Sequence, residues 1–239
     1  MKAQAVFFDA GNTLIYADPP VGQVYADALR AAGVEADPAE VAAHFRETFG
    51  RLARLRAREA TRHAAAAAAA ADAQDWWRRI VRESLEPYGP LDSFEAMFQG
   101  LWDYFARGAA WRIYDDVLPT FEALRARGKT LGLISNWDRR LDGILAELGL
   151  SGRLDSVVIS HQVGAEKPDP AIFRHAIELC GLAPGQALHV GDSLEEDVAG
   201  ARAAGIQAVW LRRGGAEEHC DPAGAPVVEG LLELLDLVE

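Results

Sequence analysis

The sequence AVFFDAGNTL, at residues 5–14, places an apolar run directly before an acid and a Gly-Asn turn. A short apolar run that is rich in Val and Phe and ends at turn residues is typical of a buried strand in a parallel sheet. Ligands of open α/β sheets bind beyond the carboxyl ends of the strands, so we expect Asp9 to project into a crevice. A carboxylate there needs a metal, a cationic side chain or a substrate as its partner. The simpler alternative is an acid that only caps the following turn.

From about residue 113 onward, strands and helices alternate regularly. Apolar runs predict strands at residues 130–134, 156–159, 187–190 and 207–211, with a short further element at 227–228. Amphipathic stretches predict helices at residues 117–127, 139–148, 169–180, 195–204 and 229–238. Repeated βα units imply parallel strands, right-handed crossovers and helices on both faces. We therefore predict an α/β fold with a Rossmann-like, doubly wound parallel sheet.

A helical insertion separates the first strand from this alternation. Residues 21–107 show helical periodicity, and their aromatic stripes are typical of the core of a small helical bundle. Such a long gap inside a compact sheet indicates an inserted domain. We assign residues 1–15 and 113–239 to an α/β core domain, and residues 16–112 to an inserted all-helical domain.

Composition narrows the classes of partner. The chain has 36 acidic and 24 basic residues and a formal net charge of −12, which argues against a general nucleic-acid-binding surface. No apolar run is long enough to span a membrane, and we expect no signal peptide before the first strand. Two isolated cysteines, Cys180 and Cys220, fit a reducing compartment. We expect a cytoplasmic protein; its oligomeric state stays open.

Polar residues follow three of the predicted strands and occupy one loop. They are Asp9, Ser135-Asn136, Asp192-Ser193 and, in the loop after the strand at 156–159, Lys167. In a parallel sheet these residues share one edge. Two neighbouring carboxylates repel each other unless a cation lies between them, and an oxygen-only set suits Mg²⁺ with a substrate phosphate. Lys167 would then neutralise either Asp9 or the phosphate, and an aspartate can also act as a nucleophile that forms an aspartyl-phosphate.

Four motifs, taken in order, resemble those of one family. They are Asp9-Ala10-Gly11-Asn12-Thr13-Leu14, Ile134-Ser135-Asn136, Lys167-Pro168 and Gly191-Asp192-Ser193-Leu194-Glu195-Glu196-Asp197. Their order and spacing resemble the haloacid dehalogenase-like (HAD) hydrolase superfamily over the whole chain, and residues 135–141 and 164–170 resemble its subfamily IA in particular. The helical insertion is similar to the C1-type cap domain of that subfamily. Each motif alone is weak, but four in order on matching strand ends form a specific signal.

The resemblance implies a role for each matching residue. Asp9 would be the nucleophile, and Lys167 would stabilise it and its phosphorylated form. Ser135 and Asn136 would bind the phosphoryl group of the substrate, with Thr13 supporting the loop beside them. The implied reaction is hydrolysis of a small phosphorylated molecule through an aspartyl-phosphate on Asp9.

The same resemblance implies a Mg²⁺ site. Asp9 and Asp192 would be its acidic ligands, and Gly11 would offer its backbone carbonyl. Asp197 would bind the metal directly or through water. For Asp197, a solvated acid at the start of a helix is an equal alternative.

Position 11 departs from the phosphatase pattern of the family. Phosphatases of this family usually carry a second aspartate there, which protonates the leaving group and later activates water, whereas this chain has Gly11. General acid–base catalysis is typically worth ~10²–10⁴-fold. We therefore expect slow hydrolysis, a substrate with a good leaving group, or an acid supplied by the cap or the substrate. His161 and Asp138 lie in suitable loops, but structural or solvent-facing roles are favoured for both.

This departure keeps two other functions open. Haloacid dehalogenases also lack that aspartate, because halide leaves without a proton, and they need no metal. Asp192 after Gly191 favours Mg²⁺ and phosphate over that alternative. A binding or regulatory protein with this fold and little turnover is the third possibility, and the presence of Asp9, Lys167 and Asp192 together counts against it.

Overall fold

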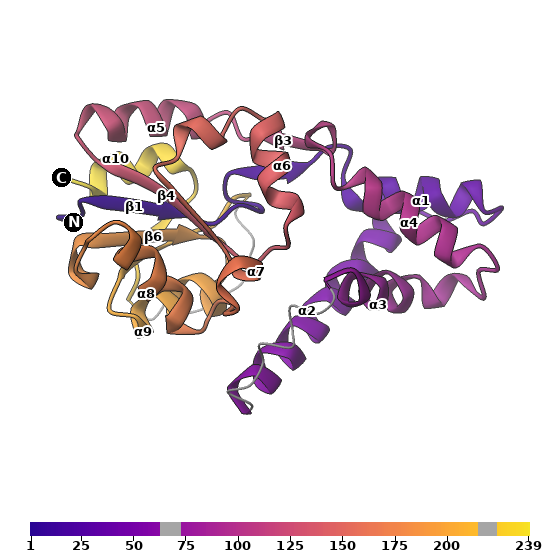
Figure 1. Ribbon diagram of the computed structural model, residues 1–239. Coiled ribbons are helices and arrows are strands. Elements are labelled where there is room, and N and C mark those ends of the chain that lie inside the picture. Colours follow the sequence, from indigo (N-terminus) through magenta and orange to yellow (C-terminus); the bar gives the residue numbers. More distant parts are fainter. Residues whose placement is uncertain (63–72, 215–223) are drawn as a thin grey trace. The chain divides into compact units, whose positions relative to one another are not determined.

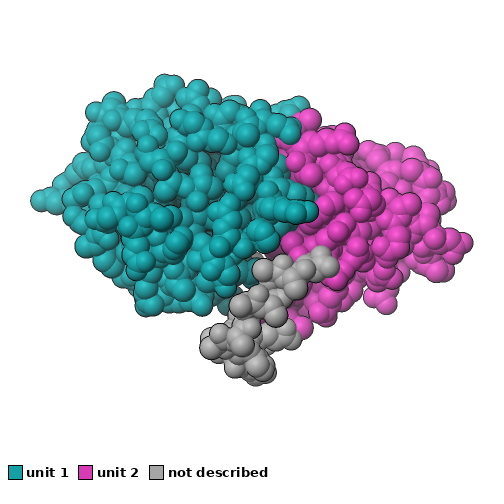
Figure 2. Space-filling model, in the orientation of Figure 1, with its two compact units in different colours: residues 1–16, 112–239 teal, residues 17–111 magenta. Residues whose placement is uncertain are grey.

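The computed structural model describes residues 1–62, 73–214 and 224–239 (Figure 1). The chain divides into two compact units, which Figure 2 shows in different colours. Unit 1 contains residues 1–16 and 112–239, and unit 2 contains residues 17–111. The role of unit 2 as a cap stays a prediction. Cys180 is a free, half-buried thiol, and Cys220 lies outside the described residues.

Unit 1 is built on a six-stranded sheet. Its strands are β1 Ala5–Phe8, β4 Thr130–Ser135, β5 Ser156–Ile159, β6 Ala187–Gly191, β7 Gln207–Leu211 and β8 Val227–Val228. They lie in the order β5-β4-β1-β6-β7-β8, and every neighbouring pair is parallel. In the centre, Phe8 pairs with Leu133 of β4 and with Val190 of β6. The predicted parallel sheet is confirmed.

Helices cover both faces of this sheet (Figure 1). They are α5 Val117–Ala126, α6 Arg140–Glu147, α7 Ser160–Val163, α8 Pro170–Leu179, α9 Gly200–Ala203 and α10 Leu234–Leu237. In Figure 1, α5 and α10 lie on one side of the strands and α8 and α9 on the other. Successive strand residues point to opposite faces: Phe7 joins a core cluster with Phe173 of α8, and Phe8 packs against Phe121 of α5 with ring centroids 5.2 Å apart. The doubly wound α/β fold is confirmed.

Some elements differ from the sequence-based prediction. Residues Leu194–Ala199 form a π-helical turn that leads into α9, instead of one α-helix over 195–204. The last helix is shorter than predicted, with a 3₁₀ turn at Leu231–Glu233 before α10. Strands β2 Ile15–Ala17 and β3 Trp111–Ile113 pair in a small second sheet that was not predicted. Elements of three or four residues carry too little periodicity to be recognised in a sequence.

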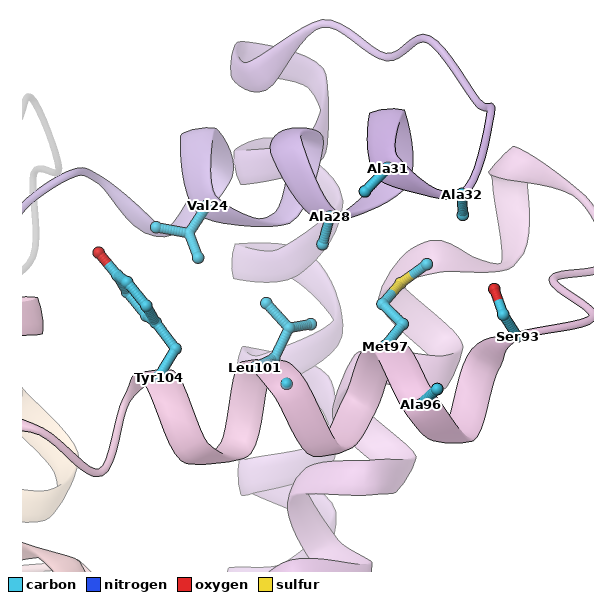
Figure 3. A pocket seen from close by; sticks show the side chains of 10 residues that line it. Val24, Ala28, Ala31, Ala32, Ser93, Ala96, Met97, Leu101 and Tyr104 are labelled. Atoms are coloured by element: carbon cyan, nitrogen blue, oxygen red, sulfur yellow. The ribbon is translucent and has the colours of Figure 1, made fainter.

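The described residues of unit 2 form four α-helices. They are α1 Val21–Ala31, α2 Pro38–Arg62, α3 Ala73–Leu85 and α4 Phe94–Tyr104. Their buried core includes Tyr25, Leu29, Val81, Phe94 and Phe98, so apolar stripes pack inward as predicted. An apolar pocket of about 420 Å³ lies between α1 and α4 and includes Ala28, Met97 and Leu101 in its lining (Figure 3). Among the described residues, no helix is both long enough and apolar enough to cross a membrane.

Candidate active site

The carboxyl ends of β1, β4 and β6 meet at one edge of the sheet. The chain runs from β1 to β4 on one side and later continues at β6 on the other, so a topological switch point lies at the end of β1. Asp9 follows β1 directly, and its backbone N–H donates to the carbonyl of Val190 at 2.9 Å. Ser135 ends β4 and Gly191 ends β6. The structure thus brings the polar strand ends together, as expected from the sequence.

Two donors orient the carboxylate of Asp9. The Ser135 hydroxyl donates to Oδ1 at 2.9 Å, and the Lys167 ammonium donates to the same oxygen at 2.6 Å. The Lys167 side chain is 1% exposed, whereas that of Asp9 is 11% exposed. Both hydrogen bonds end on Oδ1. The carboxylate is therefore fixed in orientation while it keeps some contact with solvent.

Lys167 lies between two buried acids. Its ammonium also donates to Oδ1 of Asp197 at 2.6 Å, which in turn is 2.8 Å from Nε2 of His189. The backbone N–H of Ser193 donates to the other oxygen of Asp197 at 3.0 Å. Burial alone would raise the pKa of Asp197, but Lys167 and the hydrogen bond from His189 outweigh it and hold that pKa well below its usual range. Burial lowers the pKa of Lys167, yet Asp197 and Asp9 reverse this and raise it.

The side chain of Asn136 holds the loop that carries Lys167. Its Oδ1 accepts from the Lys167 backbone N–H at 2.7 Å, and its Nδ2 donates to the Lys167 carbonyl at 2.8 Å and to Glu196 at 3.1 Å. Burial raises the pKa of Glu196 to about 7, against the opposing effect of Lys167. The predicted phosphoryl contact of Asn136 stays a prediction, since its amide is engaged by the loop in this structure.

Three acids could hold a metal ion. Asp9, Asp192 and Asp197 each offer one oxygen, and these oxygens lie within 4.8 Å of one another. Burial, followed by the charges of Asp9 and Asp197, raises the pKa of Asp192 to about 7. This is the electrostatic strain that a divalent cation relieves, and an all-oxygen set is what Mg²⁺ prefers. The donor set therefore fits Mg²⁺, and Asp197 is the least available of the three acids, because both of its oxygens already accept hydrogen bonds.

The loop after Asp9 is tied to two other segments of unit 1. Arg213, two residues after β7, donates to the Thr13 carbonyl at 2.9 Å and to both carboxylate oxygens of Asp116 at 2.8 and 2.9 Å. Its guanidinium also lies 3.8 Å from the ring centroid of Tyr114. Thr13 itself is fully buried, and its hydroxyl has no hydrogen-bond partner within the described parts of the chain. Thr13 thus lies in a fixed loop, and its assignment to substrate binding stays a prediction.

The residues around Gly11 show what lies near the position where phosphatases of the family carry a second aspartate. A Cβ atom added at Gly11 would lie 3.4 Å from Cζ3 of Trp137, so an aromatic ring already borders that position. Asp138 is buried, and both of its oxygens accept from the Arg140 guanidinium at 2.8 and 2.7 Å. His161 is exposed at the start of α7. The structural role favoured for Asp138 agrees with this geometry.

Several residues of this site were not predicted from the sequence. His189 contacts Asp197, Glu196 contacts Asn136, and Asn12 donates to Asp192 at 3.4 Å. The position of His189 inside the apolar strand Ala187–Gly191 was a signal that could have identified it, because a buried polar side chain needs a partner. Glu196 and Asn12 lie within the recognised motifs, where nothing in the spacing distinguishes them from solvated residues.

Known proteins with similar sequences belong to the family that the four motifs resemble. A family model described as haloacid dehalogenase-like hydrolase matches residues 3–205. A Danio rerio protein named haloacid dehalogenase-like hydrolase domain-containing protein 3 is 31% identical, over 96% of this chain and 93% of its own. A Thermus thermophilus protein named phosphoserine phosphatase is 33% identical, over 92% of each chain.

A solved structure shares the fold over nearly the whole length. The L-2-haloacid dehalogenase from Xanthobacter autotrophicus has a TM-score of 0.73 and 22% identity, and the match covers 98% of each chain. At this identity the likeness shows the fold alone. The family model, by contrast, spans the four motifs and most of the sequence. This chain belongs to the haloacid dehalogenase-like hydrolase family.

Proposed function

We propose that this hydrolase is a Mg²⁺-dependent phosphatase that acts on a small phosphorylated molecule through an aspartyl-phosphate on Asp9. The observation that carries the proposal is the convergence of Ser135 and Lys167 on Oδ1 of Asp9, at 2.9 and 2.6 Å. With Oδ1 held by two donors, Oδ2 is the oxygen left to attack phosphorus. An aspartate used in this way forms a covalent acyl phosphate that water then hydrolyses.

Lys167 and Ser135 supply the positive charge and the hydrogen-bond donor that phosphoryl transfer to Asp9 would need. The ammonium of Lys167 is the cation that both Asp9 and Asp197 contact, and it would keep the attacking carboxylate oriented as negative charge builds on the phosphoryl oxygens. Ser135 would donate to the phosphoryl group once Asp9 is phosphorylated. These groups are preorganised, so little reorientation is needed during reaction.

The metal would be held by Asp9 and Asp192, with the backbone carbonyl of Gly11 as a further ligand and Asp197 acting through water. When bound, Mg²⁺ would neutralise the excess of carboxylates and bring the phosphate dianion to Asp9. The raised pKa of Asp192, to about 7, supports this part of the proposal. Unit 2 would act as the cap that selects the substrate.

A dehalogenase is the second candidate, and Gly11 is the observation that favours it. A halide leaves without a proton, so an enzyme of that class needs no acid at position 11. The proximity of Asp192 to Asp9 argues for phosphate, because a metal-independent reaction leaves this pair of carboxylates without a cation between them. The phosphatase relative from Thermus thermophilus points in the same direction.

Hydrolysis of p-nitrophenyl phosphate tests the proposal. Its leaving group departs without protonation, so Gly11 should matter least for this substrate. We expect Mg²⁺-dependent turnover in the native protein, loss of turnover in Asp9→Asn, and native turnover in Asp142→Asn, which removes an exposed acid on α6. Absence of turnover with Mg²⁺ present would contradict the phosphatase. Chloride release from 2-chloropropionate in metal-free buffer would then identify the dehalogenase.

A further inference from the structure

His189 is an unusual residue for its place in the fold. It lies in the middle of β6, a strand whose five residues are all buried and which has neighbours on both sides in the sheet. Its side chain is 0% exposed and packs edge-on against Phe173, with ring centroids 5.2 Å apart. A polar ring in such surroundings costs free energy unless its nitrogen atoms find partners.

One of the two ring nitrogens has a partner. Nε2 lies 2.8 Å from Oδ1 of Asp197, whereas Nδ1 is buried and has no hydrogen-bond partner among the described residues. Because an ionised carboxylate can only accept, Nε2 must carry the proton of this hydrogen bond. Among the described residues, the free energy cost of burying the polar imidazole is therefore offset by a single hydrogen bond, to Asp197.

Asp197 links His189 to Asp9 through the ammonium of Lys167. The same oxygen, Oδ1, accepts from His189 at 2.8 Å and from Lys167 at 2.6 Å, and Lys167 donates to Asp9 at 2.6 Å. The side chains of His189, Asp197 and Lys167 are 0%, 2% and 1% exposed. A continuous buried chain of hydrogen bonds thus runs from the interior of the sheet to the carboxylate of Asp9.

We propose that His189 is a positioning residue for the reaction at Asp9. Its Nε2–H fixes Oδ1 of Asp197, and Asp197 in turn fixes the Lys167 ammonium against the nucleophile. The inference rests on the proposed function, since it concerns the orientation of the attacking carboxylate. Without the imidazole, the hydrogen bonds that remain to the Asp197 carboxylate among the described residues come from the Ser193 N–H and from Lys167, so the carboxylate and the ammonium can shift together.

The alternative is a histidine that only fills space beside Phe173. Three variants separate the two roles. His189→Gln keeps a donor at the reach of Nε2, His189→Met keeps an unbranched buried side chain without a donor, and Phe173→Leu perturbs the same packing without touching the hydrogen-bond chain. Thermal unfolding of each variant establishes that it is folded.

Steady-state kinetics with p-nitrophenyl phosphate and Mg²⁺ give the first result. We expect His189→Met to lower kcat by about 10- to 100-fold, as for outer-shell partners of metal-site ligands, with KM unchanged. His189→Gln should recover most of that loss, and Phe173→Leu should keep a kcat close to that of the native protein. Equal kcat in His189→Met and the native protein, or equal losses in the Met and Gln variants, would overturn the proposal.

A spectroscopic signal makes the test independent of turnover. The chain has only three lysines, Lys2, Lys129 and Lys167, so selective ¹⁵N-lysine labelling gives a simple spectrum. A buried, hydrogen-bonded ammonium exchanges slowly, and we expect the Lys167 signal in the native protein and in His189→Gln but its shift or loss in His189→Met. An unchanged Lys167 signal in His189→Met would refute the positioning role. A native protein with this signal but no turnover would instead disprove the proposed function alone.

Discussion

Replacing Lys167 with methionine removes the cation from the centre of the candidate site. The ammonium lies 2.6 Å from Oδ1 of Asp9 and 2.6 Å from Oδ1 of Asp197. Methionine has similar length and no charge, so the variant leaves two mostly buried carboxylates without their shared partner. We therefore expect a large loss of stability as well as a loss of activity.

The size of the effect follows from burial. Removing one partner of a buried ion pair costs about 3–5 kcal/mol, because the remaining charge stays in a poorly solvated place. For a chain of this length, 1 kcal/mol of destabilisation lowers Tm by about 2–4 °C. Multiplying this free energy cost by the Tm shift per kcal/mol gives an expected fall in Tm of about 6–20 °C for Lys167→Met.

Differential scanning calorimetry in metal-free buffer at pH 7 measures this shift, with near-UV circular dichroism as a check on tertiary structure. The matched control is Arg30→Met, which also removes a cation from an acid at 2.7 Å, but the side chains of Arg30 and Asp27 are 49% and 51% exposed. We expect no measurable change of Tm in the control, because solvent screens an exposed pair.

A second variant tests the cause of the loss. Lys167→Met combined with Asp197→Asn removes one of the two carboxylates that have lost the ammonium, so part of the lost stability should return. A Tm shift in Lys167→Met no larger than that of Arg30→Met would refute the argument that Lys167 balances two buried charges. A further loss in the double variant would show that some other contact of Asp197 dominates.

Two further perturbations act on other contacts in unit 1. A Cβ at Gly191 would lie 2.1 Å from Cγ of Asp197, so Gly191→Ala should cost about 1–3 kcal/mol and abolish phosphatase activity, as checked by calorimetry and p-nitrophenyl phosphate hydrolysis. Burial tends to raise the pKa of Asp116, but hydrogen bonds from Arg213 and the Leu231 N–H hold it below its usual value. This stabilisation is fully present above the unfolded pKa of about 3.9 and is lost as pH falls through the lower folded pKa. The difference in Tm between the native protein and Asp116→Asn should therefore shrink below about pH 4. A difference in Tm that stays constant down to pH 2 would contradict the stabilising role of the ionised Asp116 carboxylate.

The local sequence was sufficient to predict the parallel sheet and the polar edge. Strand and helix periodicities, and breakers such as the Gly-Asn turn after Asp9, depend on neighbours within a few residues, so they can be recognised without a structure. The four motifs also predicted that Asp9, Ser135, Lys167 and Asp192 would meet, because the carboxyl ends of parallel strands share one edge.

Only the tertiary structure decided which atoms touch. The fold brought Lys167, from the loop before α8, against Asp197 in the turn after β6, and with His189 these residues form one buried chain of hydrogen bonds. It also placed the Trp137 ring against Gly11 and engaged the Asn136 amide with the Lys167 loop. Asn136 and Lys167 are 31 positions apart in the sequence, and Lys167 and Asp197 are 30 positions apart. Residue spacing cannot specify these contacts, because distances between strand ends depend on side-chain packing across the whole sheet.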